Sequence, residues 1–146
     1  VFGNGPWKDL NLPPNIVLHD ALSYRESLEV MREARIVINH TPTLTAGAHE
    51  RVFDALACGC FVISTPSRFM LKELGANEGV CYYQPGSEEP CLDHLIEAIL
   101  ASPFAPERVL ASQKVVFRSH HMGVRALRLC EWAAQQWPEV FGDISG

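Results

Sequence analysis

The chain has 146 residues, of which 47% are hydrophobic and 20% are charged, a composition typical of one packed domain rather than of a disordered or fibrous segment. Seventeen acidic residues against twelve basic ones give a formal net charge of −5, which argues against broad binding to nucleic acid or to an anionic membrane. No apolar run approaches the roughly 20 residues that a membrane helix needs, so we expect no integral membrane segment.

The cysteines and histidines indicate neither a disulfide framework nor a metal site. Five cysteines are an odd number, and Cys58, Cys60 and Cys81 lie in apolar runs, where cysteine behaves as a small hydrophobic residue. We therefore expect free thiols in a reducing cytoplasm, and buried packing rather than redox chemistry at Cys58-Gly59-Cys60. The six histidines form no recognisable ligand spacing with the cysteines, so neither a metal nor another cofactor is expected.

The chain begins with an apolar pair that runs into a glycine-rich turn, without an initiating methionine. We interpret residues 1–3 as the tail of a strand, and we expect the sequence to be a fragment of a longer chain whose amino-terminal domain is absent. Gly3 and Gly5 could let a ligand approach the backbone, as glycines do in nucleotide-binding folds, although a tight turn is the commoner explanation.

The next segment alternates short apolar runs with helical patterns. Residues 15–19 follow two prolines and are predicted to form a buried strand. Ser23 and Glu26 have the spacing of a capping box, in which each side chain bonds the other residue's backbone N–H, so a helix should begin there. Residues 35–39 are apolar and β-branched, and they predict the next strand.

The same alternation continues toward the carboxyl end. Apolar residues at helical spacing predict a helix that ends at Gly59, because glycine readily adopts the left-handed conformation that closes helices. Strands are predicted at residues 61–64 and 79–83, separated by a short helix that ends at Gly75. A further helix that stops at Pro103 follows, and the remaining tail is predicted to be helical.

Continuous apolar strands that alternate with helices are typical of a parallel sheet covered on both faces. The fold class predicted for residues 1–146 is therefore a single doubly wound, Rossmann-like α/β domain. In such sheets ligands bind beyond the carboxyl ends of the strands, at the point where the strand order reverses. The loops that follow Gly3, Asn39 and Ser64 are thus the candidates for a binding site.

The loop after Asn39 contains the residues best suited to bind an anion. It is rich in hydroxyl-bearing and small residues, among them Thr45 and Gly47, and it leads into the predicted helix that contains Asp54. Free N–H groups at a helix start form an anion site, and Arg51 could add a bidentate contact to phosphate oxygens. The alternative is that Thr45 is an ordinary N-cap and that Arg51 only pairs with Asp54 three positions on.

Residues 49–65 resemble the donor-side motif of GT-B fold glycosyltransferases, in which an arginine precedes Phe-Glu-Ala-x-Ala-x-Gly and a strand follows. The Arg-x-Phe form is similar to that of the glycosyl transferase-like group that includes the spore-maturation-type proteins. The tail at residues 120–127, where two histidines and an arginine precede a leucine-rich helix, extends the likeness over most of the chain. The resemblance implies the carboxyl-terminal, nucleotide-sugar-binding half of a glycosyltransferase. Its partners would be a nucleotide diphosphate sugar and its own amino-terminal domain.

The resemblance also assigns roles to particular residues. Asp54 takes the position of the acidic residue that holds the ribose hydroxyls, Arg51 that of a diphosphate contact, and the backbone of residues 43–47 would supply N–H donors. Asp54 is one methylene shorter than the usual glutamate, and Ala46 stands where retaining members have a second glutamate, so retaining chemistry is not implied. No catalytic residue is assigned, and the sugar, the nucleotide base and the acceptor stay unspecified.

Two other classes of protein remain open. A non-catalytic Rossmann-like module in the assembly of a surface or spore component would use the same helix and glycine turn structurally, and a sugar-nucleotide epimerase has a similar fold. In the tail, Trp132 and Trp137 are predicted to pack with the leucines beside them rather than to bind a sugar. In larger GT-B proteins such a tail helix crosses to the partner domain, so part of its apolar surface is expected to be exposed.

Overall fold

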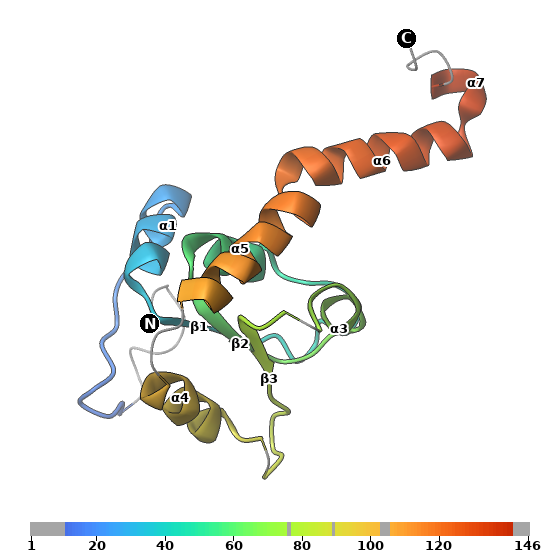
Figure 1. Cartoon of the computed structure of the whole chain (residues 1–146). Coiled ribbons are helices and arrows are strands. Elements are labelled where there is room, and N and C mark those ends of the chain that lie inside the picture. Colours follow the sequence, from blue (N-terminus) through green and yellow to red (C-terminus); the bar gives the residue numbers. More distant parts are fainter. Residues whose placement is uncertain (1–10, 76, 89, 103–105, 142–146) are drawn as a thin grey trace.

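A computed structural model describes residues 11–75, 77–88, 90–102 and 106–141 of the chain (Figure 1). Its centre is a sheet of three parallel strands, and all three were predicted from the apolar runs in the sequence. They are β1 (Ile36–Asn39), β2 (Phe61–Ser64) and β3 (Val80–Tyr82). Every residue of β2 is buried, as the central position of this strand requires.

The strands lie in the order β1-β2-β3, with Ile36 opposite Phe61 and Val62 opposite Val80. A parallel sheet flanked by helices is consistent with the predicted Rossmann-like domain. The three described strands follow one another without a reversal of strand order, so they do not display the doubly wound topology.

Helices cover both faces of the sheet, as predicted. Successive side chains of a strand point to opposite faces, and β2 feeds two hydrophobic clusters in this way. Val62 joins the larger cluster, which includes Leu56 and Val116, whereas Phe61 and Ile63 join the smaller one. The helices that contribute to the larger cluster are α1 (Tyr24–Glu33), α2 (Glu50–Cys58), α3 (Arg68–Leu74) and α5 (Pro106–Ser119). The opposite face is covered by α4 (Leu92–Ala101), which lies on the other side of the strands from α1 and α5 in Figure 1.

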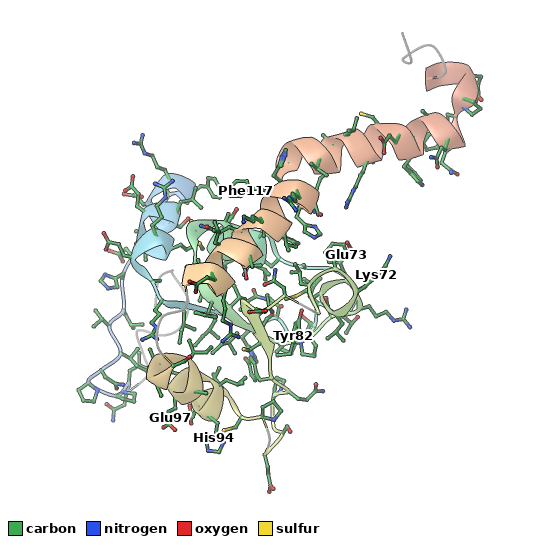
Figure 2. The ribbon with its side chains drawn as sticks, viewed as in Figure 1. Lys72, Glu73, Tyr82, His94, Glu97 and Phe117 are labelled. Atoms are coloured by element: carbon green, nitrogen blue, oxygen red, sulfur yellow. The ribbon has the colours of Figure 1, made fainter. Side chains whose placement is uncertain are left out.

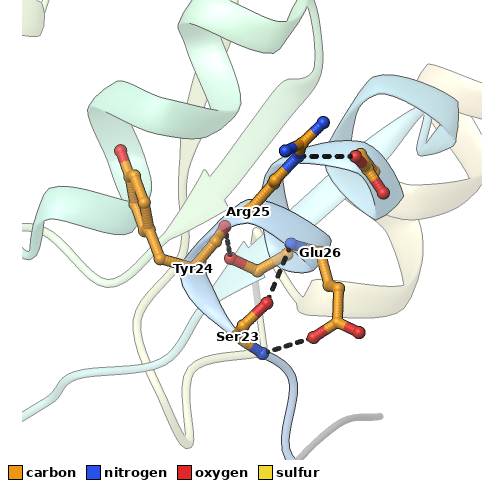
Figure 3. Close-up of polar contacts among 6 residues, drawn as sticks. Ser23, Tyr24, Arg25 and Glu26 are labelled. Atoms are coloured by element: carbon orange, nitrogen blue, oxygen red, sulfur yellow. Dashed lines mark hydrogen bonds and ion pairs between the residues drawn. The ribbon is translucent and has the colours of Figure 1, made fainter.

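The ends of α1 and α2 confirm the signals found in the sequence. The backbone N–H of Glu26 donates to Ser23 Oγ at 3.3 Å, and the N–H of Ser23 donates to the Glu26 carboxylate at 2.8 Å (Figure 3). These two bonds form the predicted capping box. Gly59 closes α2 with a φ of 91°, a conformation that costs an L-residue free energy and that glycine adopts freely.

The side chain of Arg35, just before β1, fastens α4 to the edge of the sheet. Its guanidinium donates to the carbonyl oxygens of Ile99 at 2.9 Å, Leu100 at 3.2 Å and Ser102 at 2.6 Å. These carbonyls are at the carboxyl end of α4, where the helix leaves acceptors without intrahelical partners and favours a positive charge. The Arg35 side chain thus caps the carboxyl end of α4 and links this end of the helix to the start of β1.

The predicted buried strand at residues 15–19 is wrong. The backbone N–H of Ile16 donates to the carbonyl of Pro13 at 2.9 Å and forms a turn, and residues 15–19 form no strand but carry an isolated bridge at His19. Ile16 and Val17 are 38% and 59% exposed. A short apolar run predicts a buried strand only where the fold covers both of its faces, and here the fold leaves the run at the surface.

The helical tail confirms the expectation of exposed apolar surface. After α5 the chain turns into α6 (Met122–Gln136) and α7 (Pro138–Phe141), which extend away from the sheet (Figure 1). No residue of α6 is buried, and Phe117 on α5 is also exposed (Figure 2). Trp132 and Trp137 pack edge to face against each other with ring centroids 5.5 Å apart, yet both are about half exposed. The two tryptophans therefore pack as a pair and not into the core of the domain.

Candidate functional site

The loop between β1 and α2 leads into a helix, as expected, but the N-cap of this helix is not Thr45. The first residue of α2 is Glu50, and the N-cap is His49, whose Nδ1 accepts a hydrogen bond from the N–H of Arg51 at 3.2 Å. The alternative in which Thr45 is an ordinary N-cap is therefore wrong. Thr45 lies in the preceding loop, where its carbonyl accepts from the N–H of Arg68 at 2.9 Å and ties this loop to the start of α3.

Arg51 occupies the second position of α2, and its side chain is exposed. The simple alternative, an ion pair between Arg51 and Asp54, is not formed among the described residues. The guanidinium has no side-chain partner in the part of the chain that the structure describes. It is therefore available to an anion at the positive end of the α2 dipole.

Asp54 lies one turn further along α2 and is partly buried. Its Oδ1 accepts a hydrogen bond from the Tyr24 hydroxyl at 3.1 Å. Burial raises the pKa of the Asp54 carboxyl above its ordinary value and the negative charge of Glu50 adds to the rise, while the bond from Tyr24 and the proximity of His49 oppose it. Asp54 therefore faces a phenol hydroxyl of α1 rather than the guanidinium of its own helix.

Tyr24 is the part of this arrangement that the sequence analysis missed. It is the first residue of α1, directly after the Ser23 cap, and its ring points away from the cap (Figure 3). The side chain is 65% exposed although it bonds Asp54. The negative charge of Asp54 is the main cause that raises the pKa of Tyr24, so the phenol keeps its proton. The signal that the sequence offered was an aromatic residue directly after the Ser23 cap.

Buried polar groups join the loops that follow β1 and β2, two of the three predicted site loops. Asn39 is fully buried and its Nδ2 donates to Ser64 Oγ at 2.9 Å and to Thr41 Oγ1 at 3.2 Å. Thr65 Oγ1 accepts from the N–H of Thr41 at 3.1 Å. These bonds fix where the 40–49 loop leaves the sheet and therefore where α2 begins. The third loop, with Gly3 and Gly5, lies outside the described residues.

Gly47 has no steric need for glycine. A Cβ added there would meet only Leu44 Cδ1 at 3.7 Å, which is an ordinary contact, and the backbone φ is not positive. The loop conformation therefore does not itself require Gly47. Its predicted role in donor binding stays a prediction.

The cysteines near α2 are packing groups, as predicted. Cys60 Sγ donates to the carbonyl of Met31 at 2.8 Å, and Cys58 Sγ donates to that of Leu28 at 3.7 Å. Burial raises the pKa of the Cys60 thiol to about 11, so it stays a neutral thiol. The five cysteines are free, and the described residues contain no group of three or more side chains that could hold a metal ion.

The tail motif meets α2 at Phe53. His120 is buried between α5 and α6, and its ring centroid lies 5.1 Å from that of Phe53. The guanidinium of Arg125 lies over the same ring, 5.4 Å from its centroid. The histidine and arginine of the tail thus dock α5 and α6 on the helix that contains Arg51 and Asp54.

A hollow of about 410 Å³ lies at the opposite end of the strands from the β1–α2 loop. It is lined by residues that precede β1 and β2, namely Arg32, Glu33, Ala34, Arg35, Cys58 and Gly59, and by Val109 and Gln113 of α5. Parallel sheets bind their ligands at the carboxyl ends of strands, so this hollow at the amino ends is separate from the candidate site.

Comparison with known proteins identifies one family. The sequence profile of a family described as glycosyl transferase-like matches residues 1–131. Neither a curated protein nor a solved structure matches the chain significantly. In the described part of the chain, no helix combines the length and the apolar character needed to cross a membrane.

Proposed function

The match spans nearly the whole chain, so the protein belongs to the glycosyl transferase-like family, and on that premise we propose that it binds the nucleotide part of a glycosyltransferase donor. The donor is a nucleotide diphosphate sugar. Its diphosphate lies at the start of α2 beside Arg51, and its ribose lies one turn further along, at Asp54. The loop residues Thr45 and Gly47 contribute backbone contacts to the phosphates.

The observation that carries this proposal is the separation of Arg51 from Asp54. Residues three apart on a helix lie about 5 to 6 Å apart at their Cβ atoms, so both can reach one ligand. Among the described residues the guanidinium of Arg51 has no side-chain partner at the helix start, while the Asp54 carboxylate bonds Tyr24 of α1. The Arg51 guanidinium suits the anionic end of a ligand, and the two oxygens of the Asp54 carboxylate suit hydroxyl groups at its other end.

One bond must rearrange when a phosphate arrives. The His49 side chain now accepts from the N–H of Arg51, which is one of the donors that a helix start offers to an anion. We expect the imidazole of His49 to leave this N–H as the phosphate takes its place. The alternative of a non-catalytic module rests on the same observation, because the cap already satisfies this donor without a ligand.

The exposed apolar surface of the tail supports a second proposal, which concerns an amino-terminal domain. Phe117 of α5 and Leu127, Leu129 and Trp132 of α6 each expose apolar area on the tail. We propose that the amino-terminal domain of a two-domain enzyme covers this area and supplies the acceptor site. The reacting groups would then lie between two domains, so the 146-residue chain alone is expected to lack multiple-turnover sugar transfer.

The test compares a nucleoside diphosphate with its bare nucleoside, using UDP, GDP, ADP and CDP in turn. Arg51→Lys keeps the charge but loses the planar pair of donors, so it should lose the advantage of the diphosphate and keep the weak affinity for the nucleoside. Arg118→Lys, at an exposed position on α5, is the matched control and should bind as the wild type does. Equal binding of the diphosphate by wild type and Arg51→Lys would exclude a bidentate contact between Arg51 and the diphosphate. No binding of any nucleotide would favour the non-catalytic module.

A further inference from the structure

Tyr24 is held in a fixed place by the local structure at the start of α1. The capping box locks the backbone on its amino side, and Ser27 Oγ donates to the Tyr24 carbonyl at 2.6 Å (Figure 3). With its backbone fixed, the ring spans from α1 to α2, and its hydroxyl reaches Asp54 across 30 positions of sequence. The hydrogen bond to Asp54 therefore places the phenol group beside this carboxylate.

The direction of the hydrogen bond between Tyr24 and Asp54 follows from their chemistry. An ionised carboxylate only accepts, so the phenol proton must lie between Tyr24 Oη and Asp54 Oδ1. The phenol oxygen has thereby used its only donor and can act toward any further group only as an acceptor. Because the tyrosine side chain is mostly exposed, this acceptor is accessible to a ligand.

The Asp54 carboxylate alone has little remaining capacity to accept hydrogen bonds from two neighbouring hydroxyls of a ligand. Its Oδ1 already accepts the hydrogen bond from the Tyr24 hydroxyl, and its side chain is partly buried. Tyr24 Oη and the Asp54 carboxylate, joined by one hydrogen bond, form two adjacent acceptors. The vicinal hydroxyls of a ribose have the matching arrangement, with two donors side by side.

We propose that Tyr24 and Asp54 together bind the ribose of the donor, Asp54 accepting from one hydroxyl and Tyr24 Oη accepting from its neighbour. The inference rests on the proposed function, since it names how the nucleotide site selects its ligand. The pair selects ribonucleotides over 2′-deoxy and 3′-deoxyribonucleotides, because either analogue leaves one acceptor unpaired. Tyr24 is thus a specificity-determining residue of the nucleotide site.

The experiment measures how much each ribose hydroxyl contributes to binding, with and without the phenol. Titration calorimetry is run with the tightest of UDP, GDP, ADP and CDP, and with its 2′-deoxy and 3′-deoxy analogues. Wild type should bind each deoxy analogue about 2- to 10-fold more weakly than the parent nucleotide, the range expected for one hydrogen bond. In Tyr24→Phe one of these two penalties should disappear while the other remains.

The matched control is Tyr82→Phe, which likewise removes one phenol hydroxyl, here from a tyrosine of β3 (Figure 2). The hydroxyl of Tyr82 donates to the Met70 carbonyl at 3.0 Å. This variant should keep both penalties. Thermal denaturation verifies that both variants fold, and Tyr24→Phe should do so because the ring is retained at an exposed position. If wild type binds nucleotides and Tyr24→Phe keeps both penalties, the inference is overturned and the proposed function stands. If wild type binds none of the four nucleotides, both are overturned.

Discussion

Replacing Arg35 with methionine tests how α4 is held on the sheet. The guanidinium donates to three carbonyl oxygens, those of Ile99, Leu100 and Ser102, at distances between 2.6 and 3.2 Å. Methionine preserves much of the apolar stem of the side chain and removes all three bonds. The change therefore isolates the polar contribution of Arg35 to the stability of the domain.

The size of the effect follows from these contacts. A bond from a charged donor contributes about 1.5 to 3 kcal/mol, and because the three bonds share one group and the bond to Leu100 is exposed, together they count for about 4 kcal/mol. Arg35 Nε is buried with no partner among the described residues, and removal of this unpaired donor returns about 2 kcal/mol. The free energy of unfolding should therefore fall by about 2 kcal/mol, out of the 5 to 15 kcal/mol typical of a domain.

Urea unfolding followed by circular dichroism measures this difference from the transition midpoint and the slope m. Arg25→Met is the matched control, because Arg25 is an exposed arginine whose only described ion pair is with Glu29 at 3.4 Å. Such surface pairs contribute about 0 to 1 kcal/mol, so its midpoint should hardly move. If Arg35→Met unfolds at the same urea concentration as wild type and Arg25→Met, the guanidinium does not stabilise α4 and the reasoning is refuted.

Three further predictions concern the site and its supports. Asp54→Ala should weaken the binding of a nucleoside diphosphate by about 1 to 3 kcal/mol, because a charged acceptor is lost, and unchanged affinity of a folded variant in calorimetry would remove Asp54 from the site. Gly59→Ala should destabilise the fold by about 1 to 2 kcal/mol through its φ of 91°, whereas Gly47→Ala should be neutral, and equal melting temperatures of the two variants would contradict this. Burial lowers the pKa of His120 below its ordinary 6.5. As the pH falls, His120 is therefore protonated at a higher pH in the unfolded chain than in the folded protein. The free energy of unfolding should then decrease below about pH 6.5 with a slope that His120→Gln reduces, and parallel pH profiles for the two proteins would exclude the effect.

Local signals in the sequence were sufficient for most of the secondary structure. The capping box of Ser23 and Glu26 and the closure of α2 at Gly59 involve residues at most a few positions apart, so their chemistry is legible without the fold. The strands at 36–39 and 61–64 were predicted from their short apolar, β-branched runs, and of the two only the central strand β2 is buried along its whole length. Where the prediction failed, at residues 15–19, the same apolar pattern lies on the surface, and pattern alone does not report coverage.

The candidate site was predicted only in part. The sequence placed Arg51 and Asp54 on one helix near its start, and this is where they lie. It did not identify His49 as the cap in place of Thr45, because several residues of the loop could cap a helix and the choice depends on where the loop leaves the sheet. The bonds of Asn39 to Ser64 and Thr41 decide that exit, and the buried bond to Ser64 joins β1 to β2.

Contacts between distant segments were decided by tertiary structure alone. Tyr24 bonds Asp54 from 30 positions away, and Arg35 reaches carbonyl oxygens 64 to 67 positions along the chain. Such pairs depend on the distance and angle at which helices pack on the sheet, and these are set by the shape of the whole core rather than by neighbouring residues. The sequence by itself therefore determined which segments are helices and strands and which helix contains the candidate residues. The packing of α1 against α2 determined which side chain Asp54 meets.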